Sequence, residues 1–275
     1  MPPLASPLKW AGGKRWLAPR INILYEPYRK RRLVEPFCGG LGISLQLRPE
    51  RALLNDFNEH LINFYKQVRK GWDWENWDIK RTNSKDQYYR NRTRFNTLVK
   101  EEDTRNTEAA QLFYYLNRTC FNGLCRFSKS GFFNVPFGSY KTVQMLEDLE
   151  AYKRAFAKWQ FTNVSFEKVP LKRTDFVYAD PPYDTEFRHY SPDGFTWEQQ
   201  QDLARFLANH PGPVVLSNSF TKRIRQLYAR YGFDLEFRHA PRRISSDGDR
   251  SQAWEIVAGR NLGGRLFSAP TLPAP

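Results

Sequence analysis

The chain carries several short, mainly apolar runs, each of which stops abruptly at a glycine, a proline, an acidic residue or a polar segment. They occupy residues 33–37, 52–55, 176–179 and 213–216. Runs of this length without regular polar alternation are typical of strands that are buried on both faces of a sheet. A further strand is expected from Phe161. Residues 233–239 and 254–257 predict a closing pair of strands.

Helical signals lie between these runs. Ile43, Leu45 and Leu47 follow a glycine turn at residues 38–42 and predict a helix. A second helix is headed by the segment Thr-Trp-Glu-Gln at residues 196–199, which has the spacing of a capping box. Residues 222–231 predict a basic helix. Strands that alternate with helices in this way indicate an α/β fold.

The strand pattern lapses from Glu59 to about Met145, where the chain is aromatic, basic and helix-like. Glycines and a proline at residues 121–140 predict a β-hairpin or an ordered loop within this stretch. We interpret residues 59–145 as an inserted domain, residues 1–58 and 146–267 as the two parts of one α/β domain, and the Pro-rich residues 268–275 as a disordered tail.

The charge of the chain changes the picture, because 275 residues carry a formal net charge of +14. Residues 79–100 contain seven Lys or Arg and one acidic residue, Asp86. Residues 222–243 contain seven more Lys or Arg and two acidic residues, Asp234 and Glu236. Such clusters, with Tyr88, Tyr89 and Phe95 interleaved in the first, favour nucleic acid as the partner. The alternative is that the charge only keeps the protein in solution.

Other classes of protein fit the composition poorly. Three cysteines and four histidines form no metal-ligand spacing, so we expect no metal. No apolar stretch has the length of a membrane span, and the first residues lack the apolar core of a signal peptide. We therefore expect no membrane association and a cytoplasmic protein.

Two of the predicted strands end in residues that carry chemistry. The run at 176–179 leads into Asp180-Pro181-Pro182-Tyr183, and two prolines cannot continue a sheet ladder. A carboxylate, proline carbonyls and an aromatic ring at the carboxyl edge of a sheet could clamp a flat polar group, although an ordinary turn is the alternative. Asp56 ends the run at 52–55, seventeen residues after Gly39, which is about the spacing that holds a nucleoside ribose.

The chain resembles the Dam-type DNA adenine N6-methyltransferases, which use S-adenosyl-L-methionine. The matching blocks are PLKWAGGK at 7–14, EPFCGGLG at 35–42, NRTCFNGLCRFSKSGFFNVPFGSYK at 117–141, YADPPY at 178–183 and, more weakly, RRISSDGDRSQAWEIV at 242–257. The resemblance implies a Rossmann-like, seven-stranded methyltransferase sheet with an inserted, mostly helical target-recognition domain bearing a β-hairpin.

The resemblance also implies roles for individual residues. The catalytic residues would be Asp180, Pro181, Pro182 and Tyr183, with the adenine amino group bonded to Asp180 and the Pro181 carbonyl, and Tyr183 stacked on a base flipped out of the duplex. The S-adenosyl-L-methionine site would comprise Trp10, Lys14, Phe37, Gly39, Gly40, Asp56, Phe57 and Asp180, with Asp56 on the ribose hydroxyls.

By the same resemblance, the partner is double-stranded DNA and the methylated adenine is that of GATC. The DNA-binding residues would be Lys9, Phe121, Asn122, Leu124, Arg126, Pro136, Tyr140, Arg242, Arg243 and Arg250. Members of the family usually carry tyrosine where this chain has Phe121, which keeps an aromatic wedge and loses a hydroxyl group. Arg126 has the chemistry for a bidentate contact with guanine.

Two alternatives stay open at the level of the sequence. One is a methyltransferase with another target, either an RNA adenine or the N4 amino group of cytosine. The other is an inert relative that keeps the fold only to bind DNA, although the intact Asp180–Tyr183 motif, Asp56 and the glycine turn speak against it. We expect a monomer or a weak dimer on DNA.

Overall fold

The fold is known from a computed structural model, which describes residues 4–71, 84–146, 149–184, 195–240 and 253–263. The strands are β1 (Leu33–Glu35), β2 (Ala52–Asn55), β3 (Trp159–Thr162), β4 (Phe176–Ala179), β5 (Val214–Ser219), β6 (Asp234–Ala240) and β7 (Ala253–Arg260). The α-helices are α1 (Ala18–Tyr25), α2 (Ser44–Leu47), α3 (Glu59–Lys70), α4 (Lys85–Lys100), α5 (Thr107–Thr119), α6 (Glu150–Phe156), α7 (Trp197–Ala208) and α8 (Lys222–Arg230).

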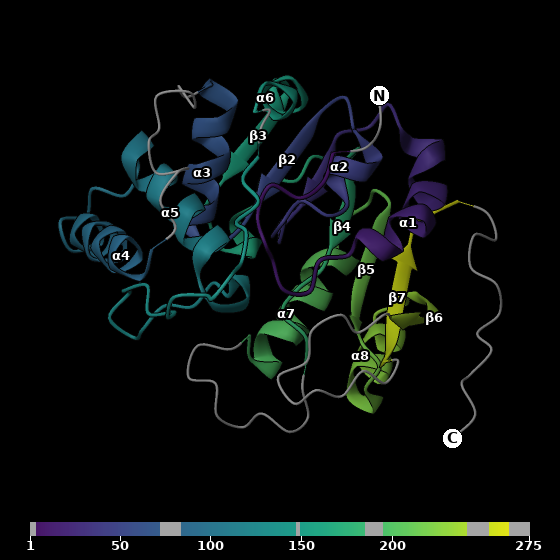
Figure 1. The fold of residues 1–275 in the computed structure, drawn as a ribbon. Coiled ribbons are helices and arrows are strands. Elements are labelled where there is room, and N and C mark those ends of the chain that lie inside the picture. The colour runs from purple at the N-terminus through teal and green to yellow at the C-terminus, as the bar shows by residue number, and fades with distance from the viewer. Residues whose placement is uncertain (1–3, 72–83, 147–148, 185–194, 241–252, 264–275) are drawn as a thin grey trace.

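The strands form one seven-stranded sheet in the order β3-β2-β1-β4-β5-β7-β6 (Figure 1). Strands β1 to β5 are parallel, whereas β7 is antiparallel to both β5 and β6. The strand order reverses beside β1, which pairs with β2 on one side and β4 on the other. Ligands of doubly wound sheets bind at the carboxyl ends of the strands at such a reversal. The predicted α/β class with a Rossmann-like sheet is confirmed.

Both faces of the sheet are buried, which explains why its strands read as apolar runs. Leu33, Leu54 and Tyr178 face one core, which also includes the apolar faces of α1, α3 and α5. Their chain neighbours Val34 and Leu53 face the other core, under α7 and α8. The alternation along each strand therefore divides the apolar residues between two layers of helices.

Helices α3, α4 and α5 lie together at one side of the sheet (Figure 1). Each begins at a polar side chain that accepts a hydrogen bond from the backbone of its first turn: Asn58 for α3, Ser84 for α4 and Asn106 for α5. This helical part coincides with the stretch in which the strand pattern lapses. The division of the chain into domains at residues 58/59 and 145/146 stays a prediction.

The segment after α5 is an ordered loop. It contains the 3-10 helix η4 (Phe121–Gly123) and two isolated antiparallel bridges, Cys120 with Phe137 and Phe127 with Phe133. We call residues 120–140 the recognition loop. Its bridges give it the course of a hairpin without a regular ladder, so the ordered-loop alternative describes it better than a β-hairpin does.

Several predicted boundaries shift. Strand β3 begins two residues before Phe161, and β5 continues past residue 216 to Ser219. Helix α2 has only four residues because Arg48, with φ 49° and ψ 57°, leaves the right-handed helical region. The capping box of α7 forms as predicted, between Thr196 and Gln199. Among the described residues, no helix combines the length and apolarity that crossing a membrane requires.

Candidate active site at the carboxyl edge of the sheet

The glycine turn after β1 forms the floor of the candidate site. A Cβ atom built on Gly39 would lie 2.8 Å from Nε1 of Trp10, and one built on Gly40 would lie 2.8 Å from Cβ of Trp10. Both distances are shorter than real contacts allow, so the tryptophan side chain packs directly on the bare backbone. Gly39 also has φ +44°, a conformation that favours glycine. The sequence therefore needs glycine at both positions.

Asp56 lies at the end of β2 and is tied to this turn. Its Oδ2 accepts a hydrogen bond of 3.0 Å from the backbone N–H of Gly39, and its Oδ1 accepts one of 3.0 Å from Asn58. Burial raises the pKa of Asp56 above its ordinary value, while these N–H groups oppose the shift. Beside it, the ring of Phe57 is 81% exposed. An oriented acceptor next to an exposed aromatic ring suits the ribose and base of a nucleoside.

Asp180 follows β4 and is fixed by the neighbouring strand. Its Oδ1 accepts a hydrogen bond of 2.8 Å from Ser217 Oγ on β5, and Ser217 Oγ is 2.9 Å from the hydroxyl group of Tyr178. The Lys14 ammonium lies 3.6 Å from the same Oδ1, and the Asp180 side chain is 19% exposed. Burial raises the pKa of Asp180 to about 6, despite the opposing effect of Lys14.

Tyr183 is held by a residue that the sequence did not single out. Its hydroxyl group donates a hydrogen bond of 2.6 Å to Oε2 of Glu255 on β7. The Lys14 Nζ lies 3.6 Å from Oε1 of Glu255 and 4.3 Å from the centroid of the Tyr183 ring. Glu255 falls within the weakest of the matching blocks, at 242–257, and that block is the only signal in the sequence that could have drawn attention to it.

The two prolines between Asp180 and Tyr183 differ in their environment. The carbonyl of Pro182 accepts a hydrogen bond of 2.9 Å from Nε2 of Gln200, whose side chain is buried on α7. Oε1 of Gln200 in turn accepts one of 3.0 Å from Asn218. In the part of the chain that the structure describes, the Pro181 carbonyl accepts no hydrogen bond. One proline carbonyl is thus anchored from within the protein, and the other keeps its capacity to accept.

Phe37 packs toward the second core. Its ring centroid lies 5.7 Å from that of Phe166 and 5.6 Å from that of Phe195, the latter in an edge-to-face arrangement. Phe37 is only half-buried, so part of its surface remains outside this packing. It follows the same strand, β1, that leads into the glycine turn.

Lys9 links the N-terminal segment to the helical part of the protein. Its backbone N–H and carbonyl pair with the side-chain amide of Asn117 on α5, each at 2.8 Å. Its ammonium donates to the Arg118 carbonyl at 3.1 Å and lies 3.7 Å from the centroid of the Tyr140 ring. Two of the residues expected at DNA, Lys9 and Tyr140, are therefore in direct contact.

The recognition loop exposes four of the side chains that the resemblance places at DNA. Phe121 is 49% exposed and Leu124 is 36% exposed, and Pro136 is exposed as well. Asn122 is exposed with φ 52°, a left-handed conformation that asparagine tolerates. Among the described residues, Phe121 and Leu124 are two of four large apolar side chains that are exposed, the others being Ile23 and Phe57.

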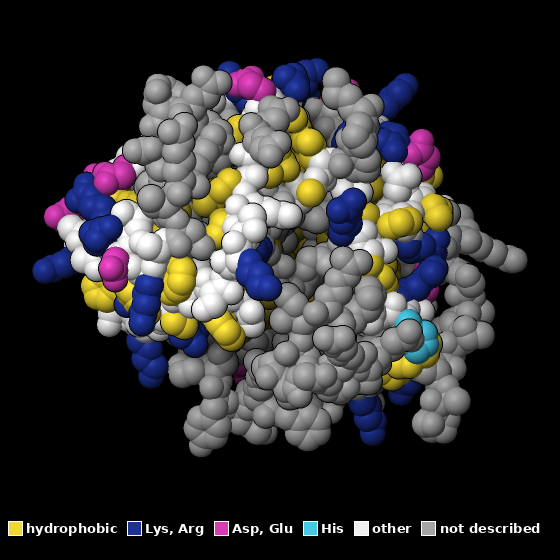
Figure 2. Space-filling view, viewed as in Figure 1, with side chains coloured by type: hydrophobic (Ala, Val, Ile, Leu, Met, Phe, Trp, Pro, Cys, Tyr) yellow, Lys and Arg dark blue, Asp and Glu magenta, His cyan; other side chains and the backbone are white. Residues whose placement is uncertain are grey.

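Arg126 is exposed but engaged within the loop. Its Nε donates a hydrogen bond of 2.8 Å to Oδ1 of Asn134, and one terminal nitrogen donates to the Asn134 carbonyl at 3.3 Å. Arg242, Arg243 and Arg250 lie outside the described residues. In the face shown in Figure 2, Lys and Arg side chains lie over the helical part on the left, with Asp and Glu side chains among them, and in the centre. The helical part and the centre of this face therefore offer positive charge to a polyanion.

The residues that the structure describes include no group of three or more His, Cys, Asp or Glu side chains that could hold a metal ion. The three cysteines are free; Cys38 and Cys120 are buried and Cys125 is half-buried.

Residues 10–241 match the family of D12 class N6 adenine-specific DNA methyltransferases. The chain belongs to this family. It is 37% identical over 269 residues to a DNA adenine methylase of Vibrio cholerae, covering 91% of this chain and 94% of the relative. It is 36% identical over 265 residues to the Retron Ec67 DNA adenine methylase of Escherichia coli, covering 91% of this chain and 90% of the relative.

A third relative is longer than this chain. The DNA N-6-adenine-methyltransferase of Escherichia phage P1 is 36% identical over 265 residues, which cover 90% of this chain and 34% of the phage protein. The chain thus spans about one third of that relative.

Proposed function

We propose that this member of the D12 class transfers a methyl group from S-adenosyl-L-methionine to the N6 amino group of an adenine that is flipped out of duplex DNA, within the sequence GATC. The observation that carries the proposal is the juxtaposition at β4. A fixed carboxylate, Asp180, is followed directly by a proline carbonyl that accepts no hydrogen bond from the described residues, at the edge where Gly39 and Asp56 form a nucleoside cradle.

The residues fit the cofactor. Gly39 and Gly40 leave bare backbone where a Cβ atom would collide with Trp10, and Asp56 presents a carboxylate that two backbone N–H groups already orient. S-adenosyl-L-methionine supplies an electrophilic methyl group on a positively charged sulfur. Asp56 would accept hydrogen bonds from the ribose hydroxyls, and Phe57 would lie against the adenine moiety. Trp10, Lys14 and Phe37 would complete the walls of the site.

Asp180 and Pro181 would act on the target base. The lone pair of an adenine amino nitrogen is delocalised into the ring, so the nitrogen is a weak nucleophile. Acceptors that take both amino hydrogens localise this lone pair on the nitrogen. Asp180 provides one acceptor and the Pro181 carbonyl the other. Gln200 holds the Pro182 carbonyl and so restrains the backbone next to both.

Tyr183 would present its ring to the flipped base. Its hydroxyl group is anchored by Glu255, which restricts the orientation of the ring. The amino group of a paired adenine is hydrogen-bonded to thymine, and the stacked neighbours cover both faces of the ring, so the base must leave the stack at a cost of a few kcal/mol. Phe121, half-exposed at the start of η4, has the shape and polarity of a wedge that fills the vacated space.

The recognition loop and Lys9 would read the sequence. Arg126 would exchange its bonds to Asn134 for O6 and N7 of a guanine, and Leu124 and Pro136 would contact a thymine methyl group. Asn122 would face a base edge. Lys9 and Tyr140, which already touch, would face the DNA together. Arg242, Arg243 and Arg250 would contact phosphates.

The test is a methylation assay with labelled S-adenosyl-L-methionine and duplexes that differ only in the four-base core. We expect label on adenine N6 in GATC and much less in every singly substituted duplex. Label on cytosine, or on RNA but not on DNA, would establish the alternative target. DNA binding without any label would establish the inert alternative.

A further inference from the structure

The recognition loop is joined to α4 by a row of side chains whose contacts the sequence did not predict. One of them, Tyr88, belongs to the cluster interpreted as facing nucleic acid, but the structure buries its side chain. Tyr88, Arg92 and Asn96 are spaced four residues apart, so they lie on one face of α4. All three bond to the backbone of the loop segment 133–135. Of the three, Asn96 is the one that bonds both the N–H and the carbonyl of a single loop residue.

The side-chain amide of Asn96 pairs with both polar backbone groups of Phe133. Its Oδ1 accepts the Phe133 N–H at 2.8 Å, and its Nδ2 donates to the Phe133 carbonyl at 3.1 Å. Phe133 itself is buried. The amide therefore does for this residue what a neighbouring strand does for an edge residue of a sheet.

The alternation of the backbone explains why Phe133 needs such a partner. The neighbouring residues bond inward across the loop: Ser128 N–H donates to the Phe132 carbonyl at 2.8 Å, and Asn134 N–H donates to the Arg126 carbonyl at 3.2 Å. Phe133 points its N–H and carbonyl the other way, toward α4. Two residues further on, the Val135 carbonyl accepts bonds from Tyr88 at 2.7 Å and Arg92 at 3.2 Å.

We infer that Asn96 is a positioning residue for base recognition, because its amide fixes the segment that carries Asn134 and Pro136. The Asn134 N–H bonds the Arg126 carbonyl and so holds the backbone from which the Arg126 side chain extends, and Pro136 is one of the exposed side chains expected at a thymine. The inference rests on the proposed function and deepens it. It assigns part of the sequence discrimination to a side chain that touches no base.

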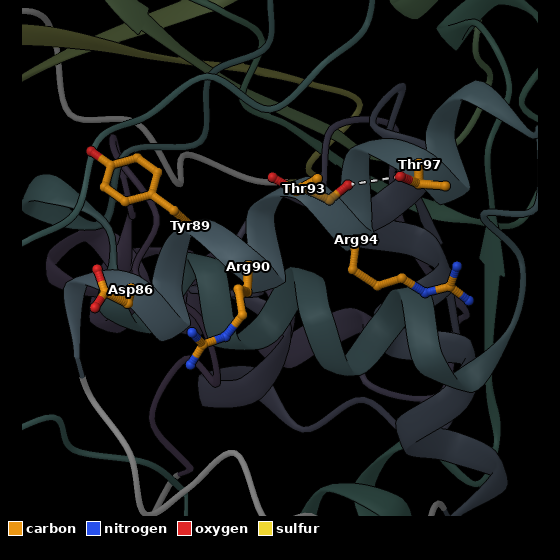
Figure 3. A pocket seen from close by; sticks show the side chains of 6 residues that line it. All are labelled: Asp86, Tyr89, Arg90, Thr93, Arg94 and Thr97. Atoms are coloured by element: carbon orange, nitrogen blue, oxygen red, sulfur yellow. Dashed lines mark hydrogen bonds between the residues drawn. The ribbon is translucent and has the colours of Figure 1, made fainter.

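The opposite side of α4 provides a matched control. Asp86, Tyr89, Arg90, Thr93, Arg94 and Thr97 line an open hollow of about 580 Å³ there (Figure 3). Thr97, the next residue after Asn96, donates its hydroxyl hydrogen to the Thr93 carbonyl of its own helix at 3.1 Å. Thr97→Val changes a half-buried polar side chain of α4 without touching the recognition loop.

The experiment compares kcat/KM on GATC and on its singly substituted duplexes for the wild type, Asn96→Leu, Asn96→Asp and Thr97→Val. Leucine has the same branched side-chain skeleton as asparagine, with two methyl groups in place of the amide oxygen and nitrogen, and it forms helix more readily, so α4 should persist. We expect Asn96→Leu to lower the GATC preference by about 5- to 150-fold, the range set by a misplaced bidentate contact. Asn96→Asp keeps the acceptor for the Phe133 N–H but turns a carboxylate oxygen toward the Phe133 carbonyl, so it should also lower the GATC preference. Thr97→Val should retain the wild-type preference.

Affinity for S-adenosyl-L-methionine, measured by calorimetry, separates positioning from general damage. None of the hydrogen bonds of Asn96 reaches Trp10, Gly39 or Asp56, so cofactor affinity should be unchanged in both variants. The inference is overturned if Asn96→Leu keeps the wild-type ratio of kcat/KM on GATC to kcat/KM on the substituted duplexes. A variant that methylates every duplex more slowly by the same factor keeps that ratio. If Asn96→Leu does not fold, Asn96→Asp takes its place: a lowered ratio of kcat/KM on GATC to kcat/KM on the substituted duplexes supports the inference, and a wild-type ratio overturns it.

The wild-type enzyme distinguishes failure of the inference from failure of the proposed function. A wild type that methylates no duplex, or methylates all of them equally, overturns the proposed specificity and the inference with it. A wild type that prefers GATC, together with an Asn96→Leu variant of equal preference, overturns the inference alone.

Discussion

The hydroxyl group of Tyr183 donates a hydrogen bond of 2.6 Å to the carboxylate of Glu255, which lies 72 residues further along the chain. The other oxygen of Glu255 lies 3.6 Å from the Lys14 ammonium, which is also 3.6 Å from Asp180. The aromatic ring and the carboxylate of the Asp180–Tyr183 motif are therefore held by one shared pair of charged residues. The negative charge of Glu255 should therefore raise the pKa of Asp180.

We expect the methylation rate to fall as the pH drops through about 6, because burial raises the pKa of Asp180 to about 6. Above that pH the side chain is a carboxylate that can accept a hydrogen bond from the amino group. Below it, the protonated form predominates and the acceptor is lost. Single-turnover rates measured from about pH 5 to about pH 7 should show a titration near pH 6. A flat profile over this range would contradict the role of Asp180.

Glu255→Gln should move this titration to lower pH. The negative charge of Glu255 raises the pKa of Asp180, so removing the charge lowers that pKa and leaves Asp180 ionised in more acidic solution. A glutamine oxygen can still accept the hydrogen bond from Tyr183. Glu198→Gln, an exposed change on α7, should leave the profile in place. An unshifted profile in Glu255→Gln would show that the two carboxylates are not coupled.

Asp180→Ala should lower methyl transfer by about 100-fold or more while leaving DNA affinity largely intact. The reason is that the carboxylate acts on the amino group in the transition state rather than on the DNA backbone. Single-turnover methylation and a DNA-binding titration give the two readouts. Asp202→Ala, a change of a partly buried carboxylate on α7 that pairs with Arg205, serves as the control. Substantial remaining turnover would rule out the proposed mechanism.

Asp56→Ala should weaken binding of S-adenosyl-L-methionine by about 10- to 100-fold, the effect of losing a carboxylate that accepts hydrogen bonds. Calorimetry measures the affinity, and circular dichroism checks that the variant is folded. Equal affinity in a folded variant would remove Asp56 from the cofactor site.

Gly40→Ala tests the contact between the glycine turn and Trp10. The added Cβ would lie 2.8 Å from Cβ of Trp10 and 3.0 Å from Oγ of Ser6, so the N-terminal segment must shift. We expect weaker cofactor binding and altered tryptophan fluorescence. At Gly13 the added Cβ would meet only the Trp10 carbonyl oxygen, at 3.7 Å, so Gly13→Ala is the matched control. Equal cofactor affinity and equal tryptophan fluorescence in the two variants would contradict the packing of Trp10 on Gly40.

Arg126→Ala should relax discrimination at one base pair of GATC by about 1–3 kcal/mol. The alternative is that Arg126 only braces the loop through Asn134, to which it is bonded in the free protein. Methylation of all single substitutions of GATC separates the two roles. A uniform loss on every duplex would favour bracing. Lys129→Ala, an exposed change in the same loop, should weaken all sequences alike if that lysine contacts phosphate.

The sequence alone was enough to predict the α/β class and the edge of the sheet at which the candidate site lies. Strands buried on both faces read as apolar runs, and the residues that end them, Gly39, Asp56 and Asp180, must then share one edge of a parallel sheet. The structure brings Asp56 to Gly39 as expected. The roles of the individual residues in binding cofactor and DNA stay predictions.

Only the tertiary structure decided which side chains support that site. Glu255 reaches Tyr183 because β7 runs antiparallel beside β5, and Gln200 reaches Pro182 because α7 packs over the same edge. Asn96 pairs with Phe133 because the recognition loop lies against α4. Local periodicity fixes which face a residue occupies, but not the partner that a distant segment brings to it. Contacts across 37 or 72 residues depend on the packing of the whole chain.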